Sequence, residues 1–570
     1  MLTYLTMELQ LGIALSAVTL VLYTLYRWSI PRPFPGIPHN VRSAKSILGD
    51  LPAMMSHGRK SGEMWDWVVS QTQLLNSPIV QIFPMPFSKP WIILADARES
   101  QDILTKRIKD FDRSVHFKEA FGDVAPFNHI NMPTGSPEFK ANRKLIQDLM
   151  TPAFLHDIAA HRIHSVATSI CDLWSEKARL ANGRPFSVLD DVYRISLDVI
   201  WAVVLPFKAD YSVINAQKQL LSALTKVDES AWQSIDDAMT FPEAEMPPLQ
   251  NAIITLTDSI GKLISSPFPV LKDWYFRMLP HMRKAKAIKE DLFTKELQAA
   301  IANLTGDSEK QTEARCAMDV ILRRELAAAT KEGRKPNLDS RNIYDEVSQF
   351  HSTTILWGLK FFTNHQDIQT KLRDAVCAGF PTAKKEQRLP TADEITRAHI
   401  PYLEATREEI LRRSITAPVL SRQAIRDTVV FGHHIPKGTD IFFLTNGPDF
   451  IAPPIATVPE HQRSESSQMA KSRTALWDSN DAHLFKPERW LVEKNGELTF
   501  DAGAGPMLTF GAGPRACFGR RLAYLELKFV FVFLVWNFTF KPIPQDLNGN
   551  AAVDKLTRFP KECYVRVAKN

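Results

Sequence analysis

The chain has 570 residues, of which 45% are hydrophobic and 23% are charged. These values are close to the averages of globular proteins, so they exclude a disordered or fibrous chain. Lys and Arg outnumber Asp and Glu by 69 to 63. This small, dispersed excess does not indicate nucleic-acid binding, which needs a concentrated basic patch.

The first feature along the chain is an apolar, uncharged run over residues 9–26. As a helix it would rise roughly 27 Å, just enough for a thin bilayer. A cleaved signal peptide and a buried core helix are the alternatives. Positive charge follows the run and does not precede it, which argues against a signal peptide. The positive-inside rule then predicts a single-pass anchor with residues 1–8 in the lumen and the body in the cytosol.

Four prolines between positions 31 and 38 predict a stiff polyproline II stalk within the basic segment 27–45. A catalytic domain is expected over 46–570. Amphipathic spacing predicts a mainly helical body with small sheets. The expected helices are 155–182, 188–204, 249–264, 284–303, 315–332, 342–375 and 401–413.

Strand signals are short. Residues 79–83 and 91–94 predict one apolar pair, and 429–431 and 440–443 predict a hairpin whose turn lies at 434–438. The Pro-, Ser- and Gln-rich segment 452–474 predicts a mobile surface loop.

Five cysteines without a CxxC pair argue against a disulfide framework and a thiolate zinc site, and they favour a reducing compartment. Four of them (Cys171, Cys316, Cys377 and Cys563) have no motif around them. Cys517 instead follows a Gly-rich stretch and precedes a predicted helix. The glycines allow tight turns and close approach to a flat group, while the helix start favours a thiolate.

The segment Phe510–Gly519 resembles the haem-binding loop of the cytochrome P-450 monooxygenases, FxxGxRxCxG, at every fixed position. The resemblance implies a cytochrome P-450 fold and haem b (iron protoporphyrin IX) as the cofactor. It implies that Cys517 is the axial ligand of the haem iron and that Phe510 shields the sulfur. It also implies that Arg515 pairs with a haem propionate and that Gly513 and Gly519 shape the loop.

Two further segments resemble the same family. Glu409 and Arg412 have the ExxR spacing, and Arg489 lies in a segment similar to the family's PERW motif. By this resemblance the three form a buried charge triad, which would be costly to break by removing one partner. Arg143 and Arg422 resemble the family's propionate clamps, with Phe139 in place of the usual tryptophan of the WxxxR helix. For both arginines, a solvated side chain is the alternative.

The central helix departs from the family. The segment 344–361 resembles the flanks of the family's acid–Thr motif, which relays protons to bound oxygen, but about seven residues, roughly two turns, are missing. His351, Ser352 and Thr353 remain as candidate proton donors, and no catalytic residue is assigned. A helical histidine such as His351 is also consistent with simple packing or solvation.

The resemblance implies a membrane-anchored monooxygenase of the fungal microsomal type, in the endoplasmic reticulum membrane. It would use O₂ and electrons from NADPH through cytochrome P-450 reductase to oxidise an apolar small molecule of specialised metabolism. Nucleic acid is not an expected partner. Two alternatives stay open. One is a haem-thiolate isomerase or dehydratase that needs no O₂. The other is a poorly active haem-binding variant, or a gene model that lacks a segment, because the acid–Thr motif is missing.

Overall fold

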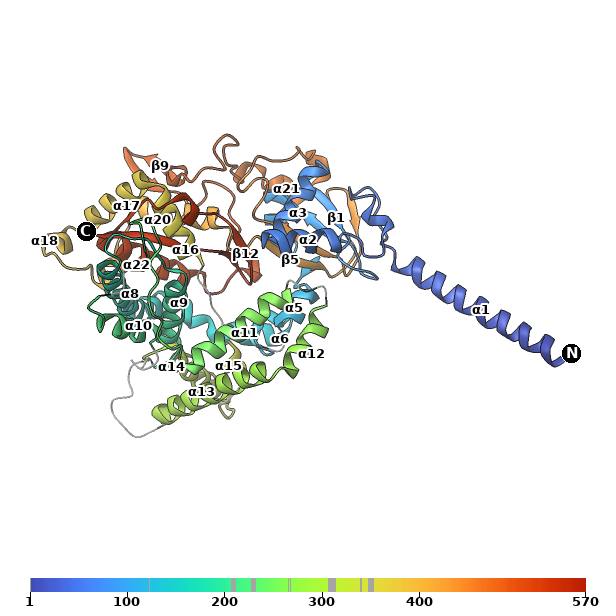
Figure 1. The fold of residues 1–570 in the computed structure, drawn as a ribbon, viewed down its shortest axis with the longest axis horizontal. Coiled ribbons are helices and arrows are strands. Elements are labelled where there is room, and N and C mark those ends of the chain that lie inside the picture. Colours follow the sequence, from blue (N-terminus) through green and yellow to red (C-terminus); the bar gives the residue numbers. More distant parts are fainter. Residues whose placement is uncertain are drawn as a thin grey trace. The chain divides into compact units, whose positions relative to one another are not determined.

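A computed structural model describes residues 2–121, 124–206, 212–226, 232–264, 266, 268–305, 314–338, 341–346 and 353–570. The described chain is mainly helical with small sheets, as predicted (Figure 1). It divides into two compact units, one formed by 1–114 with 419–474 and the other by 115–418 with 475–570.

The first unit is built on a five-stranded sheet in the order β1-β2-β8-β5-β3. Its strands are β1 Ile79–Ile82, β2 Trp91–Leu94, β3 Phe111–Asp112, β5 Val419–Ala424 and β8 Asp440–Leu444. The predicted pairing of β1 with β2 is confirmed and is antiparallel. The helices of this unit are α1 Leu2–Ser29, α2 Leu51–Ser61, α3 Met64–Leu74, α4 Ala97–Thr105 and α21 Glu465–Met469.

The predicted hairpin is wrong. Strand β6 (Thr428–Val430) pairs with β7 (His433–Ile435), and β8 pairs instead with β2 and β5. The reason lies in the two residues between β6 and β7. Phe431 and Gly432 have φ values of 50° and 77°, and two residues with positive φ make the tight turn that suits a two-residue hairpin. The later Pro-Lys-Gly turn only leads into β8.

Helix α1 contains a candidate membrane span, Leu9–Ser29, whose apolar side chains are exposed along the helix (Figure 1). The expected stalk lies against the sheet of the same unit. Gln81 on β1 accepts a hydrogen bond from the Phe34 N–H and donates to the carbonyls of Phe34 and Ile37. The segment after α1 is thus fixed by β1 as well as by its prolines.

The segment 452–474 contains regular structure as well as loop. It holds the 3₁₀ turns Glu460–Gln462 and Lys471–Arg473 in addition to α21. Arg463 forms a two-bond ion pair with Asp96 at the start of α4, at 2.6 and 2.9 Å. Nearby, the Ser464 hydroxyl donates to Asp102. These contacts attach the middle of the segment to α4, and the mobility of the rest stays a prediction.

The second unit holds the remaining helices (Figure 1). They are α5 Val115–Phe121, α6 Pro137–Ile146, α7 Pro152–Phe154, α8 Ala160–Ala181, α9 Leu189–Val204, α10 Val213–Ser222, α11 Pro248–Ile264, α12 Pro269–Met278, α13 Pro280–Thr305, α14 Ala317–Glu332, α15 Arg341–Glu346, α16 Thr354–Asn364, α17 Gln366–Gly379, α18 Pro381–Lys385, α19 Ala392–Arg397, α20 Pro401–Ser414 and α22 Arg520–Asn537. Its strands are β4 Phe186–Ser187, β9 Leu491–Lys494, β10 Glu497–Phe500, β11 Phe538–Lys541, β12 Ala552–Asp554, β13 Arg558–Pro560 and β14 Tyr564–Lys569.

The core of this unit forms around α22. Its run from Phe529 to Val535 is wholly buried, as expected for a helix that is apolar on every side. Helix α16 approaches α22 closely at Gly358, where an added Cβ would lie 2.8 Å from the Phe531 ring. Only glycine allows this approach, so Gly358 fixes the spacing of the two helices.

Six of the seven predicted helices correspond to helices of the structure. The helix expected over 342–375 is wrong as one continuous element. The structure has α15, α16 and α17 in this range instead. Helix α16 ends at Asn364, because the next residue, His365, has a φ of −123° and a ψ of 77°, which are not helical. The candidate donors His351 and Ser352, like Phe350 beside them, lie outside the described residues.

Candidate functional site

Cys517 lies at the end of the Gly-rich loop, directly before α22. Gly511 and Gly513 both have a φ of 67°, which lets the loop turn sharply twice. The Cys517 N–H donates to the carbonyl of Phe510 at 2.7 Å. Gly519 is the N-cap of α22, and its backbone N–H is hydrogen-bonded to the Cys517 sulfur. The loop thus holds the thiol at the positive end of a helix.

The environment of Cys517 differs from that of three other cysteines. Cys171, Cys316 and Cys563 are buried, whereas Cys517 is exposed. Burial raises the pKa of Cys316 and of Cys563 to about 12, which keeps both thiols protonated. Desolvation of the sulfur also raises the pKa of Cys517, but the Gly519 N–H and the positive charges of two arginines, Arg143 and Arg520, act in the opposite direction.

Arg143 on α6 lies beside this thiol, with its guanidinium 4.6 Å from the centre of the Phe518 ring. Desolvation lowers the pKa of Arg143, and the charges of Glu346 and Cys517 oppose that shift. The structure therefore places this predicted clamp residue next to the cysteine loop. Arg422 lies on β5 in the first unit, where its guanidinium donates to the Ser421 carbonyl. Its role as a propionate clamp stays a prediction.

Arg515 is held by protein groups. It donates to the Thr134 hydroxyl at 2.7 Å, to the His129 carbonyl at 3.1 Å and to the Met132 carbonyl. Its guanidinium also lies 4.2 Å from the centre of the Phe139 ring. Sequence reasoning noted only that Phe139 replaces the usual tryptophan of the WxxxR helix. It missed that an aromatic face at this position binds a cation.

Phe510 packs on Tyr524 of α22, with ring centres 5.4 Å apart. The Tyr524 hydroxyl donates to the buried Glu408 of α20 at 2.9 Å and accepts from Arg520 at 3.2 Å. Sequence reasoning missed Tyr524 and Glu408 because neither belongs to a motif. Together they link the cysteine loop to α20.

The structure brings Glu409, Arg412 and Arg489 together in the second unit. Arg412 donates two hydrogen bonds to Glu409, at 2.7 and 2.8 Å, and Arg489 donates one at 3.1 Å. Two further donors were not predicted, the Trp490 indole N–H at 3.0 Å and the Lys486 backbone N–H at 2.9 Å. The carboxylate is completely buried and accepts five hydrogen bonds.

Thr353, the one candidate donor within the described residues, is the N-cap residue of α16 and is 2% exposed. Its hydroxyl is 3.3 Å from the hydroxyl of Thr557, close to β13. Thr353 therefore has a protein partner, and its role as a proton donor stays a prediction.

Comparison with known proteins identifies the family. The family model described as "Cytochrome P450" matches residues 51–447 and 469–562. The chain belongs to the cytochrome P450 family. It is therefore an oxidoreductase of the monooxygenase type, and the family implies a haem cofactor, molecular oxygen, a redox partner and an organic substrate.

Three fungal relatives extend over nearly the whole chain. Cytochrome P450 monooxygenase TRI13 of Fusarium sporotrichioides is 37% identical, over 98% of this chain and 99% of the relative. Cytochrome P450 monooxygenase GME11363 of Pestalotiopsis microspora is also 37% identical, over 98% of each chain. Cytochrome P450 monooxygenase xilC of Penicillium rubens is 32% identical, over 96% of this chain and 94% of the relative.

Proposed function

We propose that this cytochrome P450 is a membrane-anchored monooxygenase in which the Cys517 thiolate is the axial ligand of haem b. The observation that supports this assignment most is an exposed thiol at the start of α22, beside Arg143 and Arg520. The residues fit the group because a thiolate is an established ligand of haem iron, and the loop glycines leave room for a flat macrocycle. The haem, when bound, supplies the oxygen activation needed to insert one oxygen atom into an apolar substrate.

The chain's own residues would hold the cofactor on several sides. Cys517 would bind the iron, and Phe510, fixed by Tyr524, would shield the sulfur from water. Arg143, Arg515 and Arg422 are the donors proposed for the propionates, and Arg515 would exchange some of its present backbone partners for a carboxylate.

The ligand assignment is tested by the spectrum of the reduced protein with carbon monoxide. We expect the red-shifted Soret band of thiolate ligation, and we expect Cys517→Ser to lose it. Cys377→Ser is the matched control, because Cys377 is also partly exposed and should leave the band unchanged. A band that persists in Cys517→Ala would overturn the assignment.

The proposed location is the endoplasmic reticulum membrane, with the catalytic part in the cytosol and with NADPH–cytochrome P-450 reductase as electron donor. It is supported by the apolar span in α1 and by the basic residues that follow it. Deleting residues 1–30 should release much of the protein from membranes without changing its haem spectrum. If protease digests the body only after the vesicles are opened, the proposed orientation is wrong.

The substrate proposed here is an apolar small molecule of specialised metabolism, a class supported by the fungal relatives. We also propose that this exact chain couples electron use to product poorly. The described part of the central segment offers the buried Thr353, already bonded to Thr557, and no carboxylate in the acid–Thr position. The alignment with the Fusarium relative spans 588 positions, more than the length of this chain, so the relative contains residues that this chain lacks.

Coupling is measured as product formed per NADPH consumed, with hydrogen peroxide release as the complementary quantity. A version with an Ala-Gly-x-Asp-Thr segment inserted after Phe350 should give more product and less peroxide. Tight coupling by the unaltered chain would show that another group supplies the protons. Turnover without any electron donor would instead indicate an isomerase or dehydratase.

A further inference from the structure

Glu346, the last residue of α15, is a buried acid to which the sequence motifs assign no role. None of its side chain is exposed. Its carboxylate accepts hydrogen bonds from the backbone N–H and the Nδ1 of His129, both at 2.6 Å, and from the Asn142 side chain on α6 at 2.9 Å. These bonds replace the water that a buried carboxylate loses. Glu346 thus joins α15 to α6 and to the segment before it.

The partners of Glu346 belong to the surroundings of the cysteine loop. The ring centre of His129 lies 6.2 Å from that of Phe518, which follows Cys517. The His129 carbonyl accepts a hydrogen bond from Arg515 at 3.1 Å. Glu346 and Phe518 also line the same cavity, of about 20 Å³. Glu346 therefore lies among the residues proposed to hold the haem.

Arg143 is the cation next to Glu346 that has no anionic partner. Within the part of the chain that the structure describes, its guanidinium forms no hydrogen bond or ion pair, and it lies over the Phe518 ring. The negative charge of Glu346 still acts on Arg143. The proposed propionate clamp thus has a guanidinium that can accept a carboxylate, with another carboxylate already beside it.

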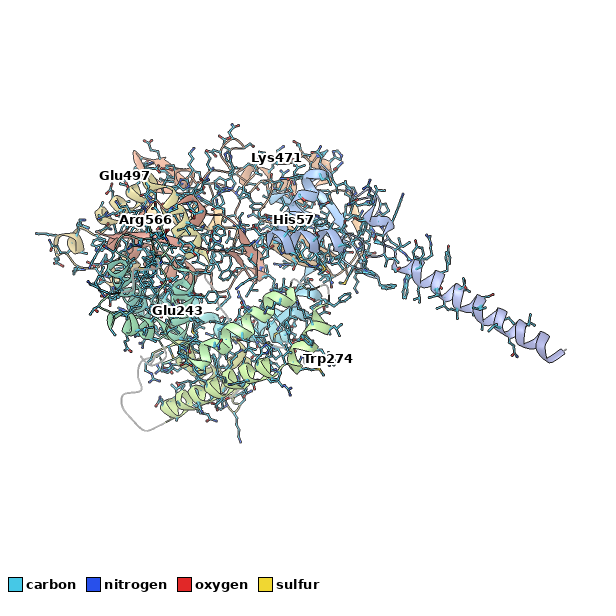
Figure 2. All side chains as sticks on the ribbon, in the orientation of Figure 1. His57, Glu243, Trp274, Lys471, Glu497 and Arg566 are labelled. Atoms are coloured by element: carbon cyan, nitrogen blue, oxygen red, sulfur yellow. The ribbon has the colours of Figure 1, made fainter. Side chains whose placement is uncertain are left out.

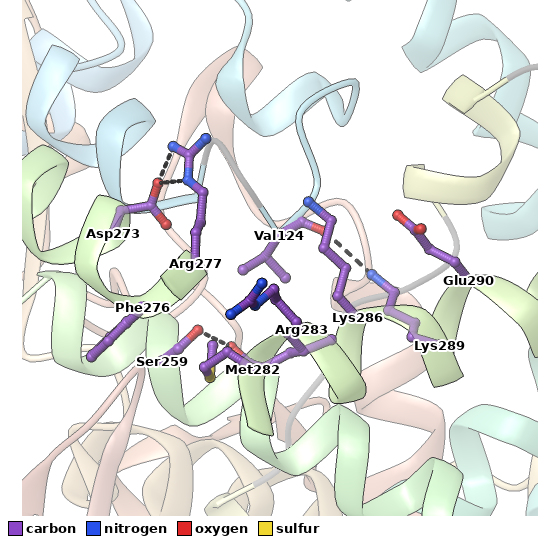
Figure 3. A pocket seen from close by; sticks show the side chains of 11 residues that line it. Val124, Ser259, Asp273, Phe276, Arg277, Met282, Arg283, Lys286, Lys289 and Glu290 are labelled. Atoms are coloured by element: carbon purple, nitrogen blue, oxygen red, sulfur yellow. Dashed lines mark hydrogen bonds and ion pairs between the residues drawn. The ribbon is translucent and has the colours of Figure 1, made fainter. Parts of the chain in front are cut away.

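A larger cavity of the same unit shows how an acid is neutralised in this protein. Asp273 and Arg277 line a cavity of about 170 Å³ between α11, α12 and α13 (Figure 3). The Arg277 Nε lies 2.8 Å from the Asp273 carboxylate, so the two charges offset each other. Among the described residues, no arginine or lysine forms such a pair with Glu346, whose donors are a histidine and an amide. The negative charge of Glu346 can therefore act on a neighbouring anion.

We propose that Glu346 competes with a haem propionate for the positive charge of Arg143 and so weakens the binding of haem by this chain. The inference rests on the proposed function, in which Cys517 binds the iron and Arg143 pairs with a propionate. Two carboxylates at one guanidinium repel each other. The cavity beside Glu346 has room for about one water molecule, so solvent would screen this repulsion only weakly.

The alternative is that Glu346 supports the site by holding His129 and α6 in place. The hydrogen bonds to Glu346 argue for competition, because the amide of Asn142 and the backbone N–H of His129 need only an oxygen acceptor. A neutral glutamine supplies that acceptor as well. The two roles predict changes of opposite sign when the charge of Glu346 is removed, so one measurement separates them.

The test uses the haem-loaded full chain and measures the rate at which haem passes to excess apomyoglobin, followed by the Soret absorbance. We expect Glu346→Gln and Glu346→Ala to lose haem at least about fivefold more slowly than the parent chain, because the propionate no longer faces a second negative charge. If both groups act on Arg143, their effects are coupled. In an Arg143→Gln background, Glu346→Gln should therefore change the rate by about twofold or less.

Two matched controls remove a carboxylate elsewhere in the same unit. Asp273→Asn removes a buried one, and Glu497→Gln removes an exposed one on β10 (Figure 2). Both should lose haem at the parent rate, and circular dichroism should show all variants folded.

Three results would overturn the inference. They are faster haem loss from the Glu346 variants, an unfolded Glu346→Gln protein, and equal rates in the test and control variants. The first two would mean that Glu346 supports the fold or the site. A parent chain that binds haem without the band of thiolate ligation would instead refute the assignment of Cys517, so the two failures are distinguishable.

Discussion

Two buried glutamates of the second unit have opposite environments. Glu409 on α20 accepts five hydrogen bonds, three of them from arginine side chains. At Glu526 on α22, burial is the only influence on the ionisation of the carboxyl, and it raises the pKa of Glu526 to about 8. Its Oε1 is buried and has no hydrogen-bond partner among the described residues. Burial is therefore similar at the two sites, and the donors around each carboxyl decide whether it is charged.

The comparison separates two ways of placing an acid in a core. A carboxylate that keeps its charge needs enough donors to replace water, because the desolvation penalty amounts to several kcal/mol per ion. A carboxyl without such donors takes up a proton instead. Glu409 follows the first way and Glu526 the second. The same substitution should thus have very different effects at the two positions.

The largest effect is expected from Arg412→Ala. This change removes two of the five hydrogen bonds to Glu409 and leaves a buried charge without enough compensation. The expected loss of stability is about 3–5 kcal/mol, so little haem-loaded protein should accumulate. The measurements are the yield of folded protein and its haem content.

Arg397→Ala on α19 is the matched control, because Arg397 is exposed and its removal should cost almost nothing. A well-expressed Arg412→Ala protein with normal haem content but no turnover would show that Glu409 and Arg412 serve catalysis and not the fold.

The Glu409 cluster also shows what a sequence can predict. The ExxR spacing placed Glu409 and Arg412 one helical turn apart, and the PERW segment indicated Arg489. The indole of Trp490 and the backbone N–H of Lys486 were not predicted, since their contacts depend on how the chain returns to α20. Local motifs therefore predicted the charged members of the cluster, while tertiary packing decided its completeness.

Elsewhere the sequence was less informative for physical reasons. The hairpin of β6 and β7 depends on positive φ at Phe431, a conformation that phenylalanine rarely adopts, so the Pro-Lys-Gly turn looked more favourable. The Phe139–Arg515 contact joins residues that are far apart in the sequence. Neither feature produces a local periodicity. Helices with amphipathic spacing, such as α8 and α9, were placed from the sequence.

The second prediction concerns Glu526→Gln and its dependence on pH. The folded pKa of about 8 lies above the usual pKa of a glutamate, 4.5. The folded state therefore retains a proton that the unfolded state releases, and the stability of the parent chain falls as pH rises from about 4.5 to about 8. Glutamine cannot ionise, so the variant should lack this loss. The difference should reach the order of 3 kcal/mol at neutral pH.

The measurement is the thermal unfolding midpoint of both proteins between pH 5 and pH 8. The two midpoints should nearly agree at pH 5, and the variant should become the more stable protein as pH rises. Glu497→Gln on β10 serves as the control, because Glu497 is exposed. A difference that stays constant across this range would mean that Glu526 is ionised in the folded state.

Glu408 is intermediate between these two glutamates, and it gives the smallest expected effect. It is 4% exposed, and desolvation raises its pKa, while Arg407 and the Tyr524 hydroxyl lower it. Tyr524→Phe removes one donor but keeps the ring that packs on Phe510. Losing one hydrogen bond to a buried carboxyl should cost about 1–2 kcal/mol.

This small loss should appear in the unfolding midpoint and not in the spectrum of the carbon monoxide complex, because the aromatic contact that supports the cysteine loop remains. Tyr524→Ala removes the ring as well and should weaken that spectrum. Tyr275→Phe, at an exposed tyrosine, controls for the loss of a hydroxyl. If Tyr524→Phe and Tyr524→Ala weaken the spectrum equally, the hydroxyl and its bond to Glu408 hold the loop, and Glu408 then resembles Glu409 more than Glu526.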